Sequence, residues 1–131
     1  MKQVRDPAGP SAGQESVPSS EQDLLSRAFS AYNAQDADGL LALISDDVDW
    51  PDGSARLRGK AALYAYWADQ WTRTGTHDQP IDFRRRPDGR VAVRLIQVVR
   101  SLDGSLMSRG PYQYVFRMKG SLIIGLDIED A

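Results

Sequence analysis

The sequence contains no cysteine, a single histidine and no long hydrophobic run. Without cysteine there can be no disulfide, no thiolate nucleophile and no cysteine–zinc site. The one histidine, His77, argues against a serine triad and against a histidine-based metal site. No apolar stretch approaches the roughly 18–20 residues that a membrane-spanning helix needs. We therefore expect no metal, no cofactor and no membrane partner.

The sequence also has little excess charge, with a net charge of −2 over 131 residues. A protein without a basic surplus lacks the electrostatic footprint of a nucleic-acid binder. No secretory apolar region opens the sequence, because Val4 and Val17 stand alone among polar residues. We expect a cytoplasmic protein. Its length and its hydrophobic content of 41% are those of one globular domain with one core.

The pattern along the chain divides it into a tail and a domain. Residues 1–19 are rich in proline, glycine and serine and are predicted to be a disordered tail, so that residues 20–131 form the domain. Ser19-x-x-Gln22 has the form of a capping box, and an apolar face of helical period follows it. A short second helix is expected after Asp36 or Asp38, and a third helix opens at Gly59.

From Ile81 onward the apolar period changes from helical to two. Turns at Pro87-Asp88-Gly89, Asp103-Gly104 and Lys119-Gly120 separate long strands over 90–102, 105–119 and 122–128. Helices followed by a meander indicate an α+β fold. Long strands in a twisted sheet must coil, so we expect three N-terminal helices packed on a strongly curved antiparallel sheet with an internal pocket.

Several side chains are candidates for that pocket. Tyr112 and Tyr114 share a strand face with Phe116, and Gln97 is a lone amide on an apolar strand face, where it needs a ligand or a buried polar partner. Trp50 ends a short strand and is a pocket candidate. The remaining candidates have two interpretations each: Trp67 is core or ligand-stacking, Asp127 faces solvent or the cavity, and Asp52 is a turn residue or a catalytic one.

The order of these elements resembles the nuclear transport factor 2-like superfamily, which includes ketosteroid isomerase and the SnoaL-like cyclases. The resemblance covers roughly residues 21–129. A bacterial SnoaL-like subgroup without an assigned reaction is similar in the motifs Trp50-x-Asp52-Gly53, Arg58-Gly59-Lys60, Tyr66-Trp67, Asp88-Gly89-Arg90-Val91 and Gln97-Val98-Val99-Arg100. The fold it implies is a cone-shaped half-barrel, commonly paired as a homodimer through the open sheet face.

Only some of the functional residues of these families have a counterpart in this sequence. The resemblance places the proton-shuttling aspartate of ketosteroid isomerase at Asp52 and the aspartate of the cyclases at Asp127. One oxyanion donor of the isomerase falls near Ala28, where no hydroxyl exists, and the other falls at Tyr114. One donor is thus lost and the other is changed in kind, which argues against steroid isomerisation.

The sequence predicts a pocket protein for a small-molecule ligand that acts as a cofactor-independent enzyme of proton-transfer type, such as an isomerase, cyclase or hydratase, on an apolar oxygenated substrate. Asp52 is the predicted acid–base group and Tyr114 the predicted hydrogen-bond donor. Predicted ligand contacts are Trp50, Trp67, Gln97, Tyr112 and Asp127. The alternative is a non-catalytic binding or dimerisation module. The enzyme hypothesis expects Asp52, Tyr114 and Gln97 to converge on one cavity of about 300 Å³ or more.

Overall fold

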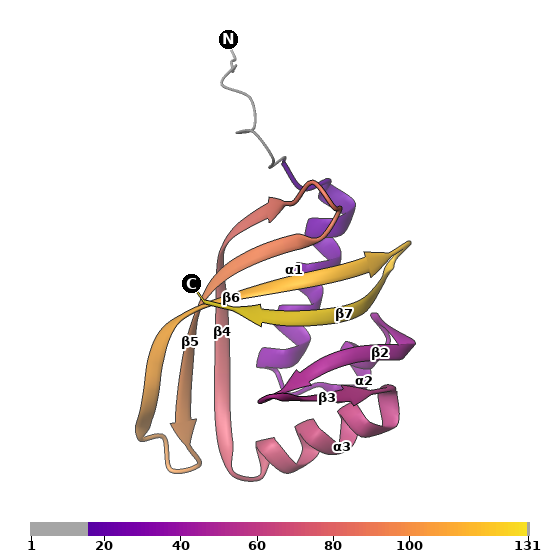
Figure 1. The fold of residues 1–131 in the computed structure, drawn as a ribbon. Helices are drawn as coiled ribbons and strands as arrows, with labels where there is room; N and C mark the ends of the chain where they lie inside the picture. Colours follow the sequence, from indigo (N-terminus) through magenta and orange to yellow (C-terminus); the bar gives the residue numbers. More distant parts are fainter. Residues whose placement is uncertain (1–15, 131) are drawn as a thin grey trace.

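The computed structural model describes residues 16–130 (Figure 1). Within this range the helices are α1 (Ser19–Asn33), α2 (Ala37–Leu41) and α3 (Lys60–Trp71). The strands are β2 (Ile44–Asp52), β3 (Ala55–Arg58), β4 (Thr74–Arg85), β5 (Val91–Ser101), β6 (Leu106–Lys119) and β7 (Leu122–Glu129). The predicted α+β class, with helices packed on a curved sheet, is confirmed.

The strands form one sheet in the order β3-β2-β7-β6-β5-β4. Consecutive strands from β4 to β7 pair antiparallel as the predicted meander, while β2 lies parallel to β7. The register shifts between Pro80 and Asp82 in β4, between Val99 and Arg100 in β5, and between Arg117 and Met118 in β6. Such irregularities bend a strand and increase its twist, which gives the sheet its concave face.

The strand β4 begins earlier than its sequence pattern indicates. It starts at Thr74, whereas alternating hydrophobicity is readable only from Ile81. The segment Thr74–Pro80 contains glycine, histidine and proline and lacks an apolar repeat, yet it pairs residue by residue with β5. This segment carries the polar group on which the site depends.

The helices cover part of the concave face (Figure 1). The helix α1 buries Leu25 and Phe29, and α3 buries Leu63 and Trp67, against strand residues such as Val93. No helix in the described part of the chain is long and apolar enough to cross a membrane. The helices and the sheet enclose the core, and a pocket lies between them.

The helix starts agree with the sequence in one case and differ in another. Asp36 caps α2, because its Oδ1 accepts a hydrogen bond from the Gly39 N–H at 3.0 Å. The predicted capping box at Ser19 is wrong. The N-cap of α1 is Pro18, no side chain caps the helix, and Ser19 is already its first helical residue. The Pro18 carbonyl instead accepts hydrogen bonds from two backbone N–H groups of the first turn.

Candidate functional site

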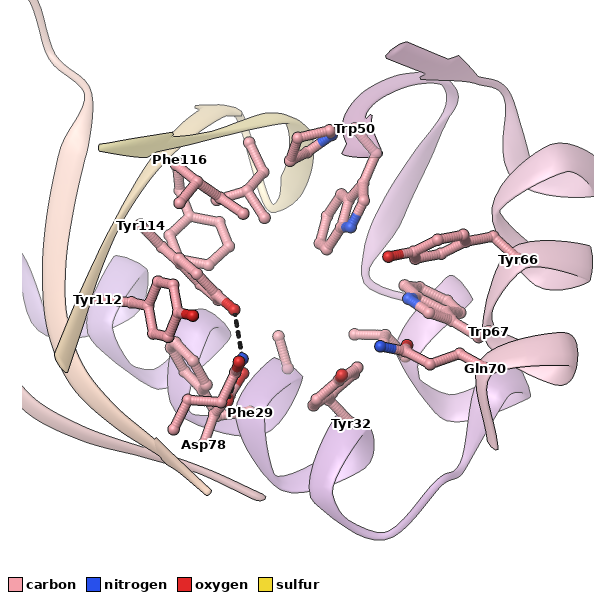
Figure 2. A pocket seen from close by; sticks show the side chains of 16 residues that line it. Phe29, Tyr32, Trp50, Tyr66, Trp67, Gln70, Asp78, Tyr112, Tyr114 and Phe116 are labelled. Atoms are coloured by element: carbon pink, nitrogen blue, oxygen red, sulfur yellow. Dashed lines mark hydrogen bonds between the residues drawn. The ribbon is translucent and has the colours of Figure 1, made fainter. Parts of the chain in front are cut away.

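A pocket of about 260 Å³ lies between α1, α3, the end of β2 and the concave face of the sheet (Figure 2). Its volume is close to the lower end of the range typical of ligand sites, about 300–1,000 Å³. Aromatic side chains dominate its wall, and Asp78 is the only Asp, Glu, Lys, Arg or His among the described residues that line it. The lining residues are Ala28, Phe29, Tyr32, Leu40, Trp50, Pro51, Tyr66, Trp67, Gln70, Asp78, Gln97, Tyr112, Tyr114, Phe116, Leu126 and Ile128.

One polar cluster joins three neighbouring strands at the pocket wall. Asp78 on β4 lies directly across from Gln97 on β5. The Gln97 Nε2 donates to Asp78 Oδ1 at 2.9 Å and to the Tyr114 hydroxyl oxygen at 2.9 Å. Figure 2 shows the second bond as a dashed line at the Tyr114 hydroxyl. Since the Tyr114 oxygen accepts this hydrogen bond, its own hydrogen is free to be donated, to Asp78 or to a bound molecule.

Burial changes the proton affinity of this cluster. Asp78 is only 2% exposed, and burial raises the pKa of its carboxyl above its ordinary value of 3.8, while the hydrogen bond from Gln97 partly opposes the rise. Burial, and then the charge of Asp78, also raises the pKa of Tyr114. The tyrosine therefore remains a donor, and the acid is shifted in the direction that suits proton exchange.

The last residue of α1 holds Asp78 in place. The Asn33 Nδ2 donates to the Asp78 carbonyl at 2.8 Å, and the Asp78 N–H donates to Asn33 Oδ1 at 2.8 Å. Because β4 is an edge strand, this side-chain amide takes the position of a missing strand partner. The backbone of Asp78 is therefore held by β5 on one side and by Asn33 on the other.

Most of the residues predicted from the sequence line this pocket. They are Trp50, Trp67, Gln97, Tyr112 and Tyr114. Trp67 is 1% exposed and belongs to the core as well, with the Trp50 ring edge-on to it at a centroid distance of 5.7 Å. Tyr112 is 39% exposed and lies at the pocket opening.

The structure places the other two predicted residues elsewhere. Asp52 is the exposed last residue of β2, paired with Ala55 at the start of β3, and is absent from the pocket lining. Its charge reaches the pocket only as a secondary cause, after burial, of the raised pKa of Tyr66. Of the three residues expected to converge, Tyr114 and Gln97 therefore meet in the cavity, and Asp52 lies outside its wall.

Asp127 lies on the opposite face of the sheet from the pocket. Its neighbours Leu126 and Ile128 line the pocket, so strand alternation turns Asp127 outward. Its carboxylate pairs there with Arg56 at 3.2 Å and with Arg117 at 3.7 Å. No group of three or more His, Cys, Asp or Glu side chains within residues 16–130 is arranged to hold a metal ion.

Sequence reasoning missed Asp78, Gln70, Tyr32 and Tyr66 as pocket residues. Asp78 is one of 18 acidic residues and stands in a segment without apolar alternation. One feature of the sequence would have helped. Thr76 and Asp78 pair with Val99 and Gln97 on β5, and strand alternation therefore places them on the inward face of the sheet. That signal is readable only once the register is known.

Comparisons with known proteins agree with this geometry. Residues 25–124 match the family described as the SnoaL-like domain, so the chain belongs to the SnoaL-like family. No curated protein matches the sequence significantly. The fold is similar to many solved structures.

Three of these similar structures combine low sequence identity with high TM-score and coverage. A candidate polyketide cyclase from Xanthomonas campestris is 17% identical with a TM-score of 0.74, over 84% of this chain and 89% of that chain. A candidate polyketide cyclase from Sinorhizobium meliloti is 23% identical with a TM-score of 0.71, over 84% and 98%. A Catenulispora acidiphila protein with a ketosteroid isomerase-like fold, in complex with trimethylamine, is 14% identical with a TM-score of 0.71, over 83% and 85%. At these identities the likeness establishes the fold.

Proposed function

We propose that this SnoaL-like protein is a proton-transfer enzyme acting on a small, apolar, oxygenated molecule. The observation that carries the proposal is the buried carboxyl of Asp78, joined through Gln97 to the Tyr114 hydroxyl at the wall of an aromatic pocket. A carboxyl with a raised pKa beside a hydrogen-bond donor is the pair that carbonyl enolisation requires. The acid–base role predicted for Asp52 passes to Asp78 in this proposal, because Asp78 lines the cavity.

The reaction would run through an enol or enolate. The Tyr114 hydroxyl donates a hydrogen bond to the carbonyl oxygen of the substrate. The Asp78 carboxylate removes a proton from the adjacent carbon, the C–H electron pair becomes a C=C bond, and negative charge collects on the oxygen that faces Tyr114. Asp78 then returns the proton to the same or another carbon, so the step is redox-neutral. The raised pKa of Asp78 makes the return favourable.

A second candidate function is non-catalytic binding of a small amine. One buried carboxyl among aromatic rings is the arrangement that holds an ammonium ion through charge and cation–π attraction. The Catenulispora acidiphila relative is in complex with trimethylamine. In this alternative Asp78 serves as a counter-ion and no proton moves.

Hydrogen–deuterium exchange tests the enzyme proposal without knowledge of the natural substrate. The probe is β-tetralone, a two-ring ketone, whose α-hydrogens are followed by NMR in D₂O with and without protein. We expect wild-type protein to accelerate exchange, Asp78→Asn to lose that acceleration by about 100-fold or more, and Tyr114→Phe to lose about tenfold. Thermal melting of each variant controls for folding.

The matched comparison is Asp52→Asn, which removes a carboxylate outside the pocket. Loss of exchange in Asp52→Asn with retention in Asp78→Asn would assign the acid–base role to Asp52. If wild-type protein accelerates no exchange but binds trimethylammonium, and Asp78→Asn abolishes that binding, the amine-binding function replaces the enzyme. Quenching of tryptophan fluorescence reports the binding, since Trp50 and Trp67 line the pocket.

A further inference from the structure

A second polar group faces the same pocket from α3. Gln70 lines the cavity, and its Oε1 is buried without a hydrogen-bond partner in the protein. Figure 2 shows the Gln70 and Asp78 side chains on opposite sides of the cavity. The enzyme chemistry proposed above uses the Asp78 side and leaves Gln70 without a role.

A buried amide oxygen without a partner needs an explanation. Leaving such an acceptor unsatisfied destabilises the folded protein, and most buried polar atoms in folded proteins are paired. Within residues 16–130 no group donates a hydrogen bond to this oxygen. The Gln70 amide oxygen is thus an acceptor that a ligand in the pocket can satisfy.

The aromatic walls of the pocket between Asp78 and Gln70 restrict which ligands can bind. On one side of the pocket the Trp50 ring lies edge-on to the Trp67 ring, with a centroid distance of 5.7 Å. On the other side the Phe29 and Tyr114 rings are stacked, with a centroid distance of 6.4 Å. Flat aromatic surfaces favour a planar ring by stacking or edge contacts. The cavity of about 260 Å³ is below the range for drug-sized ligands, so it suits one or two rings.

We propose that Gln70 determines substrate specificity by accepting a hydrogen bond from a hydroxyl or N–H group at the end of the substrate remote from Asp78. The substrate class is a one- or two-ring planar ketone that carries a hydrogen-bond donor across the ring system from its carbonyl. The identity of the reacting end rests on the proposed function, whereas the contact with Gln70 rests on the unpaired amide oxygen.

The test compares two ligands that differ only in the donor. They are hydroxy-β-tetralone and methoxy-β-tetralone, substituted at matching positions on the aromatic ring, and both the 6- and 7-isomers are used. Binding is measured by tryptophan quenching and α-hydrogen exchange by NMR. We expect wild-type protein to bind the hydroxy compound of one isomer about tenfold more tightly than its methoxy partner. Gln70→Leu should remove this preference and bind the methoxy compound at least as well as wild-type protein does.

Two control variants complete the design. Gln70→Glu keeps an acceptor and should retain the preference for the hydroxyl compound, whereas Asp78→Asn should retain the binding preference while losing exchange of both compounds. Equal affinity of wild-type protein for both members of each pair, or a preference that survives in Gln70→Leu, overturns the role of Gln70 and leaves the enzyme proposal standing. A Gln70-dependent preference in a protein that accelerates no exchange overturns the enzyme proposal and supports the contact. If neither compound binds, the substrate class is wrong.

Discussion

At the scale of single residues, the burial of Asp78 lowers the stability of the folded state. Its carboxyl is buried and accepts a hydrogen bond from the neutral amide of Gln97, while Asn33 bonds only the Asp78 backbone. Burial raises the pKa of this carboxyl, with the hydrogen bond from Gln97 as the main opposing effect. Carboxyl groups whose pKa is shifted by burial are common in active sites.

This cost predicts a pH-dependent gain in stability for Asp78→Asn. The unfolded carboxyl titrates near its ordinary value of 3.8, and the folded one at a higher pH. Between these two values the folded state binds more protons than the unfolded state, so the stability of the wild-type protein falls as pH rises. Asparagine does not titrate and retains an oxygen that accepts from Gln97. We expect its melting temperature to exceed that of wild-type protein by a few degrees at pH 7–8, with the difference vanishing below about pH 4.

Differential scanning calorimetry from pH 3 to pH 8 measures this effect. A constant difference across the range would mean that Asp78 titrates alike in the folded and unfolded states. A lower melting temperature of the variant at pH 8 would contradict the prediction.

At the scale of elements, the site depends on the contact between the end of α1 and β4. The Asn33 side chain makes both a donor and an acceptor bond to the backbone of Asp78, which lies 45 residues further along the chain. The register shift in β4 follows directly after Pro80. The helix thus anchors the edge strand just before this register shift, at the β4 residue that lines the pocket.

Removal of this anchor should affect stability and function together. Asn33→Ala leaves two backbone groups of Asp78 unpaired, so we expect a loss of about 1–3 kcal/mol in the free energy of unfolding. We also expect a fall in kcat for β-tetralone exchange, with a smaller change in KM, because the carboxyl is displaced while the aromatic walls remain. Chemical denaturation and exchange kinetics measure the two effects.

The variant Asn33→Asp keeps an acceptor for the Asp78 N–H, loses the donor and adds a negative charge. It should lie between wild-type protein and Asn33→Ala in kcat. A kcat that remains at the wild-type value in Asn33→Ala would show that β4 holds Asp78 without help from α1.

At the scale of the whole molecule, the sheet face opposite the helices predicts self-association. Of the outward-facing apolar residues on the long strands, Ala92 and Val115 are already buried within one chain, at 8% and 0% exposure. Ile96 and Val98 remain half-buried, and Met107 is 59% exposed. Half-buried apolar side chains on an open sheet favour a partner. We propose a homodimer through this face.

Light scattering at micromolar concentration should return twice the chain mass of 14.5 kDa. Ile96→Lys places a charge on this face, away from the pocket, and should shift the mass toward that of the monomer. A wild-type protein of monomer mass, or an Ile96→Lys variant that remains dimeric, would contradict an interface centred on β5.

The N-terminal boundary of the domain gives a further prediction. The tail predicted over residues 1–19 lies outside the described residues as far as residue 15, whereas Ser19 is helical. We propose that residues 1–15 alone are dispensable for stability. Val17 packs against the core, and the Pro18 carbonyl accepts hydrogen bonds from the N–H groups of Glu21 and Gln22, each at 3.0 Å. A chain that starts at Ser16 keeps these contacts and should melt with the full-length protein. A chain that starts at Ser19 loses them and should melt a few degrees lower. Equal melting of the two truncations would show that Val17 contributes nothing.

The sequence by itself determined the order and type of most elements, but it did not indicate β3 or the first half of β4. The apolar period of α1 and α3, the cap at Asp36, and the turns before β5, β6 and β7 are local signals, because neighbouring residues fix backbone geometry through sterics and short hydrogen bonds. Tyr114 and Gln97 were also readable, since strand alternation places each on the face of its apolar neighbours.

Only the tertiary structure decided which acid enters the pocket. Asp52 and Asp78 both stand in polar segments, and no local pattern separates them. Asp78 is buried because Asn33 and Gln97, distant in sequence, meet it when α1 and β5 pack on either side of β4. Asp52 stays exposed because the β2–β3 hairpin ends at the surface. Burial is a property of long-range contacts, and the pKa shift that gives Asp78 its proposed role exists only once those contacts form.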